Sequence, residues 1–381
     1  MKATGWWLLF SLSFPFFPGE ALASYSYVDL HPAGWIESRA TCVNGRGEVA
    51  GYGIAGSGER GFLWSAGIAT EVLPPGSSSA RAAWVNGQGD VAGTAVFGGR
   101  TRAFLYRNGN YLDPTPGWAY SEAVYVAEDG AVTGTGEFGA YISRDGVPEL
   151  LPEFTVVVGV NFAGQLLGSA ENTARLYLPG AGYITICPPG ASAAVPGGLN
   201  DSGLVAVSAR QADSERAFVY SGGFYILMTP PGWTSSNAKA INNRSQVAGF
   251  GVSPAGRRSF LRTGSAYEEL FFPGWKATEA VSLNDPGQVA GSGETASGET
   301  HAFVATPAAT ASAGSGQGGD GATSGGGGCA MVSGDHRAPF TASALMSLLA
   351  LLVPILPSLV RANQGSSPTS RRDFSRYRTI A

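Results

Sequence analysis

The feature that most restricts the fold of this chain is a motif that occurs seven times along the sequence. Its clearest copies are residues 42–51 and 84–93, which both contain Val-Asn-Gly and end in Val-Ala-Gly. The lead position falls at residues 44, 86, 127, 161, 200, 242 and 284, so successive copies lie 42, 41, 34, 39, 42 and 42 residues apart. Internal repeats of this length indicate a solenoid, a propeller or a similar array.

Turn residues dominate the motif. Six of the seven leads are Asn, with Ala127 as the exception, and six copies have Gly three residues later, with Ser245 as the exception. Asn and Gly tolerate positive φ, so Asn-x-x-Gly predicts a tight hairpin between two short apolar strands. The predicted turn positions are Asn44, Gly47, Asn86, Gly89, Asn161, Gly164, Asn200, Gly203, Asn242, Asn284 and Gly287.

Two further strands complete each unit. A third strand with an aromatic centre follows, as in residues 102–106, 216–220 and 300–304. A fourth, such as residues 225–228 or 267–270, leads to a Pro-Gly-Trp at Trp118, Trp233 or Trp275. Four strands in about forty residues are the content of one propeller blade. A β-helix is the alternative, but its rungs are shorter. We expect the Trp residues to pack between blades rather than to form a sugar-binding surface.

The two ends of the repeat region are complementary. The seventh unit stops after its third strand at residues 303–306, and a matching fourth strand precedes the first unit at residues 27–30, followed by Gly34-Trp35. A first strand that completes the last blade would close the ring and remove the exposed sheet edges. The 56 Gly, 23 Pro and 14% charged residues suit short strands and turns. We therefore predict an all-β, seven-bladed β-propeller over residues 24–306, closed by the N-terminal strand.

Residues 1–23 have the pattern of a signal peptide. Lys2 precedes the apolar run of residues 6–10, and Ala21-Leu22-Ala23 is a small-x-small cleavage pattern. A transmembrane helix is the alternative, but Pro15 and Pro18 make the run too short to span a membrane. The sequence predicts export.

The other end of the chain predicts a membrane attachment. Residues 307–328 form a linker rich in Gly, Ala and Ser, and Cys329 follows directly. Residues 340–360 contain no charge and are long enough for a single transmembrane helix. Five Arg and one Asp in residues 361–381 would keep the tail on the cytoplasmic side, so that the propeller faces outward. Residues 329–381 are thus expected to be a sorting or anchor segment.

The C-terminal segment and the repeat region each resemble a known bacterial family. Residues 329–381 are similar to C-terminal sorting tags of the myxobacterial type, although the tail is longer than usual. This resemblance implies cleavage near Cys329 by a membrane-embedded sorting protease. We hypothesise that Cys329 marks the processing or lipid-attachment point. A plain membrane anchor is the alternative. The hairpins and the Arg-Ala-Phe strands resemble the extracellular His-Ala-Phe repeat family, with one literal copy at His301-Ala302-Phe303. That resemblance implies a secreted, propeller-like protein and no particular chemistry.

The sequence shows no catalytic motif, and we predict no catalytic residue, metal or cofactor. Ring closure would bring His31 and His301 together near Asp29 or Glu299, which could ligate a metal. Because other repeats carry Arg or Ala at the position of His301, we interpret it as a strand residue instead. Asp201 and Asp285 directly follow a repeat Asn and are interpreted as turn residues rather than calcium ligands. Residues 24–306 hold 17 Lys and Arg against 24 Asp and Glu, which does not suit nucleic acid.

These observations predict a non-enzymatic, surface-anchored binding or adhesion module. Its partners would be the membrane, a sorting protease and an unknown extracellular ligand, namely a glycan, matrix or protein. We expect a monomeric propeller at the cell surface, in the outer membrane or in the extracellular space. A structural surface scaffold is the alternative. A hydrolase or lyase is the third interpretation, and it would need clustered carboxylates or His at the central channel.

Overall fold

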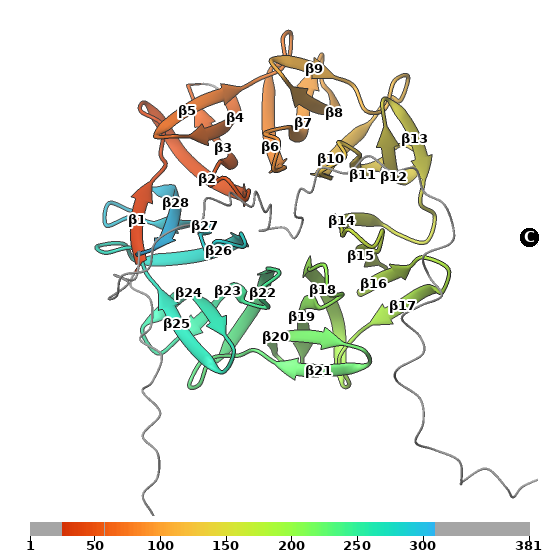
Figure 1. Ribbon diagram of the computed structural model, residues 1–381. Coiled ribbons are helices and arrows are strands. Elements are labelled where there is room, and N and C mark those ends of the chain that lie inside the picture. The colour runs from red at the N-terminus through yellow and green to blue at the C-terminus, as the bar shows by residue number, and fades with distance from the viewer. Residues whose placement is uncertain (1–24, 57, 309–381) are drawn as a thin grey trace, which may run out of the picture. The chain divides into compact units, whose positions relative to one another are not determined.

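The computed structural model describes residues 25–56 and 58–308, and these residues form seven four-stranded antiparallel sheets arranged around a centre (Figure 1). The prediction of an all-β, seven-bladed propeller is therefore confirmed. The predicted helix over residues 340–360 lies outside the described residues, as do residues 1–23, the linker from residue 309 on, and Cys329. Within the described ranges, no helix is long and apolar enough to cross a membrane.

The first three blades follow one another along the chain from the innermost strand to the outermost. Blade one consists of β2 (Trp35–Val43), β3 (Val49–Ala55), β4 (Gly58–Ser65) and β5 (Ile68–Val72). Blade two consists of β6 (Ser79–Val85), β7 (Val91–Phe97), β8 (Arg100–Arg107) and β9 (Asn110–Leu112). Blade three consists of β10 (Ser121–Val126), β11 (Val132–Gly136), β12 (Gly139–Arg144) and β13 (Val147–Leu150).

The next three blades have the same order. Blade four consists of β14 (Val156–Val160), β15 (Leu166–Ala170), β16 (Thr173–Leu178) and β17 (Gly182–Ile186). Blade five consists of β18 (Ala191–Leu199), β19 (Val205–Gln211), β20 (Ser214–Ser221) and β21 (Phe224–Leu227). Blade six consists of β22 (Ser235–Ile241), β23 (Val247–Ser253), β24 (Gly256–Thr263) and β25 (Ala266–Leu270).

Blade seven is built from both ends of the repeat region. Its inner strands are β26 (Ala277–Leu283), β27 (Val289–Glu294) and β28 (Thr300–Pro307), and its outermost strand is β1 (Tyr25–Asp29). The β1–β28 pairing is antiparallel and runs in register from Tyr25↔Pro307 to Asp29↔Phe303. The Tyr27 hydroxyl also accepts a hydrogen bond from the Phe271 backbone N–H of the neighbouring blade, at 3.1 Å. The predicted closure by the N-terminal strand is confirmed.

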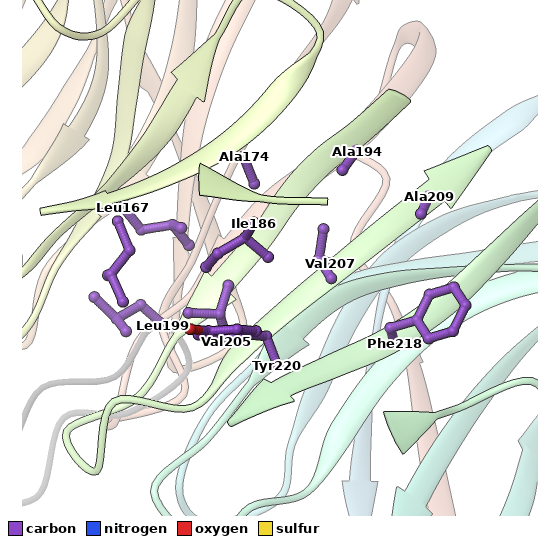
Figure 2. Packing of buried hydrophobic residues seen from close by; sticks show 11 residues of the cluster. Leu167, Ala174, Ile186, Ala194, Leu199, Val205, Val207, Ala209, Phe218 and Tyr220 are labelled. Atoms are coloured by element: carbon purple, nitrogen blue, oxygen red, sulfur yellow. The ribbon is translucent and has the colours of Figure 1, made fainter. Parts of the chain in front are cut away.

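The hydrophobic core is divided among the seams between blades. Strand residues alternate between the two faces of a sheet, so each blade offers an apolar face to each neighbour. The buried residues form seven clusters, and each cluster draws on two adjacent blades. Figure 2 shows the cluster between blades four and five, in which Leu167 and Ile186 meet Leu199 and Val207. Each blade is therefore stabilised by contact with its neighbours as well as by its own strand pairing.

The Pro-Gly-Trp segments contribute to these seams, as expected. Trp275 is 9% exposed, and its ring lies edge-on to Phe303 with 5.9 Å between the ring centroids. Trp233 packs in the same way on Phe260 at 5.8 Å, as does Trp35, which follows Ala-Gly, on Phe62 at 5.9 Å. Each of these ring pairs lies within one blade, and the same three Trp side chains also pack in the cluster that the blade shares with its neighbour.

The seam between blades six and seven predicts a pH dependence of stability. Glu268 on β25 is half-buried beside Tyr25 and Tyr27, and burial raises the pKa of its carboxyl from 4.5 to about 7. The folded protein therefore binds this proton more tightly than the unfolded chain does. Its free energy of unfolding should fall as the pH rises from about 4.5 to about 7. Chemical denaturation of Glu268→Gln across this range should show a smaller fall.

The control is Glu269→Gln, which removes the same charge from the next residue of the strand. Glu269 is exposed and lies 3.4 Å from the Arg258 guanidinium. This variant should keep the pH profile of the wild type. An unchanged profile in Glu268→Gln would show that Glu268 does not cause the dependence.

Candidate functional site

The predicted turn positions stand at one end of the innermost strands. In the first copy, the Asn44 N–H donates to the Glu48 carbonyl at 3.0 Å and the Gly47 N–H donates to the Asn44 carbonyl at 3.0 Å. The Asn44 side-chain Oδ1 accepts from the backbone N–H groups of Arg46 and Glu48. Gly47 has a φ of 81°, in the left-handed region that favours glycine. The motif therefore builds the tight hairpin that its chemistry predicts.

The same asparagine has a second role that the motif did not reveal. Its side-chain amide donates to the backbone carbonyl of the lead residue in the next blade. This link joins Asn44 to Asn86 at 2.8 Å, and Asn284 to Asn44 at 2.9 Å across the closing seam. The remaining links run from Asn86 to Ala127, Asn161 to Asn200, Asn200 to Asn242, and Asn242 to Asn284. Six of the seven seams therefore carry an asparagine bond, and we call this set the asparagine ring.

A tyrosine substitutes at the seam where the ring is interrupted. The lead of blade three is Ala127, which has no side-chain amide. Two residues earlier, the hydroxyl of Tyr125 donates to the Val160 carbonyl of blade four at 3.1 Å. Tyr125 is 2% exposed and packs on Trp84 with 4.6 Å between the ring centroids. A side-chain to backbone bond thus crosses this seam as well.

Asp201 and Asp285 also bridge blades. The Asp201 carboxylate accepts from the Phe162 backbone N–H at 3.2 Å, and the Asp285 carboxylate accepts from the Asn243 N–H at 2.8 Å. Between them, Asn243 Oδ1 accepts from the Asp201 N–H at 2.9 Å. Burial raises the pKa of the Asp201 carboxyl. These residues bind the turn of the preceding blade, which agrees with the interpretation as turn residues.

The wall of the central channel is built on a bulge in each innermost strand. In every blade the pairing with the second strand skips the residue three positions before the lead of the motif. Blades one and five skip a second residue as well, Ile36 and Ser192. The residues skipped three positions before the lead are Thr41, Ala83, Val124, Val158, Gly197, Lys239 and Val281. An extra residue bends a strand locally and redirects a side chain. A cavity of about 60 Å³ at the centre is lined by four of these residues together with Trp84 and Tyr125.

Lys239 is the charged member of this set. Its ammonium lies 5.7 Å from the centroid of the Phe250 ring, a cation–π distance. Burial lowers the pKa of Lys239, and the nearby carboxylates of Glu279 and Glu215 oppose this shift. The position therefore holds a half-buried cation beside the channel.

The residue two positions before each bulge changes character from blade to blade. Blades six, seven, one, two and three place polar or charged residues there, whereas blades four and five place Val. Two of the charged residues form ion pairs with the preceding blade, Arg81 with Glu59 at 2.6 Å and Glu279 with Arg257 at 2.5 Å. This position is thus polar in five consecutive blades and apolar in the other two.

His31 and His301 come together at the closing seam, as closure requires. Their rings stack with 3.8 Å between the centroids and 6° between the planes. His301 Nδ1 lies 2.8 Å from Asp29 Oδ2, and His31 Nε2 lies 3.1 Å from the Trp35 carbonyl oxygen. Stacked rings direct their nitrogens side by side rather than toward one point. Among the described residues, no group of three or more His, Cys, Asp or Glu is placed to hold a metal ion.

The asparagine ring predicts a large stability effect. Asn242 is fully buried, and its amide donates to the carbonyl of Asn284 and to Gln246 Oε1, while its Oδ1 accepts from two backbone N–H groups. Asn242→Ala leaves these groups unpaired, which should lower the free energy of unfolding by about 2–4 kcal/mol. Urea denaturation would measure this loss. Asn110→Ala is the control, because the Asn110 amide bonds Asn108 at the exposed surface and its loss should change stability little. Equal losses would contradict a special role for the ring.

The comparisons with known proteins concern the fold. No family model and no curated protein matches the chain. Virginiamycin B lyase from Staphylococcus aureus is similar in structure, with 12% identity and a TM-score of 0.48 over 74% of this chain and 99% of the lyase. A subtype N11 neuraminidase-like protein (H18N11, flat-faced bat) has 12% identity and a TM-score of 0.33, over 61% of this chain and 89% of its own. At these values the similarities carry no argument about activity.

Proposed function

We propose that this chain is a non-enzymatic binding module, exported and held at the cell surface by its C-terminal segment. The observation that carries this proposal is a contrast within the repeats. The lead residue that joins the blades is Asn in six of the seven copies, whereas the bulge residues are Thr, Ala, Val, Val, Gly, Lys and Val. A structural scaffold needs only the constant lead residues that join the blades. Diversity at one position of a rigid frame is typical of a surface that has been fitted to a ligand.

The polarity of the channel wall supports the same function. The ligand would meet the Lys239 ammonium next to the apolar side chains of Val158 and Val281, which line the same central cavity. A wall of mixed character suits an extracellular glycan or a protein segment, both of which have polar and apolar parts.

Lys239 allows a matched test of binding. Purified protein would be applied to an array of glycans and to extracted extracellular matrix, and Lys239→Val, which introduces the residue found at three equivalent positions, would be compared with the wild type. We expect the variant to bind at least about tenfold more weakly, a change of about 1.4 kcal/mol. Thermal unfolding would verify its fold.

Lys276→Val is the control. Lys276 is the other lysine among the described residues, and its ammonium pairs with Glu294 at 3.2 Å on the exposed rim. This variant should bind like the wild type. Binding by Lys239→Val that equals the wild type would show that the ligand does not use Lys239, and no binding by the wild type would favour the structural scaffold.

The anchoring part of the proposal concerns Cys329. Its place between a Gly-rich linker and a charge-free segment supports a processing or lipid-attachment point. Because one lipid chain holds a protein weakly, stable display would need a second chain or contact. Intact-mass spectrometry of protein from its native membrane should show that residues 340–381 are missing, and Cys329→Ala should release the protein or leave it unprocessed. A mature mass that includes Ala381, with normal anchoring of the variant, would indicate a plain helix anchor.

A further inference from the structure

The outermost strands carry a repeated tyrosine that blade one lacks. The position is occupied by Tyr27, Tyr111, Tyr183, Tyr225 and Tyr267 in five blades, by Pro148 in blade three, and by Ala69 in blade one. In most blades the tyrosine ring covers the side chain opposite it on the third strand. The ring centroids of Tyr177 and Tyr183 lie 5.1 Å apart, and those of Tyr220 and Tyr225 lie 5.3 Å apart.

In blade one the large aromatic side chain is on the third strand and the small one is on the outermost strand. The residue opposite Ala69 is Trp64, which is larger than the residue at this position in any other blade. A methyl group stands where the other blades place a ring, and a cavity of about 540 Å³ lies beside it. This cavity is lined by Trp64, Trp35 and Phe62 from blade one, by Asp29 and His31 from the closing segment, and by Glu71 from β5. Cavities of about 300–1,000 Å³ with aromatic walls and a few polar groups are typical of small-molecule sites.

Blade three shows that the missing tyrosine alone does not create such a site. There the residue opposite Pro148 is Ser143, and the neighbouring cavity of about 370 Å³ has no aromatic residue in its lining. Blade two keeps its tyrosine, Tyr111, and has a cavity of about 550 Å³ that Phe97 and Phe104 line. The cavity of blade one differs from both because two tryptophans line it.

The polar groups of the cavity are held in place. Asp29 Oδ1 accepts from the His31 backbone N–H at 2.9 Å, and its other oxygen lies 2.8 Å from His301 Nδ1. Glu71 lies 3.6 Å from the Arg60 guanidinium. Because each carboxylate already has a partner of its own, the cavity suits neutral hydroxyl groups better than a free cation. Carboxylate oxygens accept hydrogen bonds from hydroxyls and have spare lone pairs for them.

We propose that this cavity, at the seam between blades seven and one, binds a neutral saccharide unit. A sugar ring has a face of C–H groups, which would lie on Trp64, and a rim of hydroxyls, which would bond the carboxylates of Asp29 and Glu71. The site is separate from the central channel, and the proposal deepens the proposed function because it names a ligand class for the binding module.

The test uses the full-length protein and purified sugars. Isothermal titration calorimetry with glucose, galactose, mannose, N-acetylglucosamine and their disaccharides should detect binding of at least one, with a Kd of about 1 mM or tighter. Tryptophan fluorescence should change in the same titration. Ala69→Tyr restores the residue of the other blades and should weaken binding at least about tenfold, as should Trp64→Leu if the tyrosine variant fails to fold.

The matched control is Ile226→Tyr, which adds the same ring to the outermost strand of blade five. Ile226 is 48% exposed, so this variant should bind like the wild type. Absence of binding by every sugar, or normal binding by folded Ala69→Tyr and Trp64→Leu, would overturn the saccharide site. Loss of sugar binding in Lys239→Val alone would also overturn it, because the sugar would then occupy the channel. Binding to extracted matrix without binding to any sugar would refute this proposal while the proposed function stands.

Discussion

The hydrogen bond from a repeat asparagine to the carbonyl of the next blade is the interaction on which the rest of the propeller depends. Each asparagine uses its oxygen to close its own hairpin and its amide to bind the neighbouring hairpin. The residues are buried, and an unpaired amide there would be costly. The blades are therefore positioned by polar bonds of fixed geometry at the axis, while the apolar clusters farther out supply most of the contact area. The bulged strands and the channel wall take their places from this ring.

The fold could be predicted from the sequence because its determinants are local and repeated. Asn-x-x-Gly specifies a turn wherever it occurs, and the displaced fourth strand at residues 27–30 shows how the ring closes. The cross-blade role of the asparagine could not be predicted, because turn chemistry alone already accounts for the residue. The hydrogen bond by which Tyr125 replaces the missing asparagine bond could not be predicted either, because its partner Val160 belongs to another blade and to a different position in the repeat.

The candidate sites were harder to predict because they arise where a repeat departs from its own pattern. The copies of a repeated motif can be aligned with one another in the sequence. A cavity, however, arises when two residues on different strands both differ from the repeat. Ala69 looks like an ordinary strand residue until it is placed opposite Trp64. The histidine pair shows the reverse case. Closure correctly predicted that His31 and His301 meet, yet only the structure shows that their rings stack.

The closure of blade seven has a consequence for how the chain folds during its synthesis. Among the described strands, the first to be synthesised pairs with the last, so β1 has no sheet partner until residues 300–307 exist. Joining such distant segments carries a loop-closure entropy cost, and contacts of this kind form slowly. Until then, β1 and the open edge of β28 are free to pair with other chains. Because of this order of synthesis, the pairing of β1 with β28 competes with β-pairing between different chains.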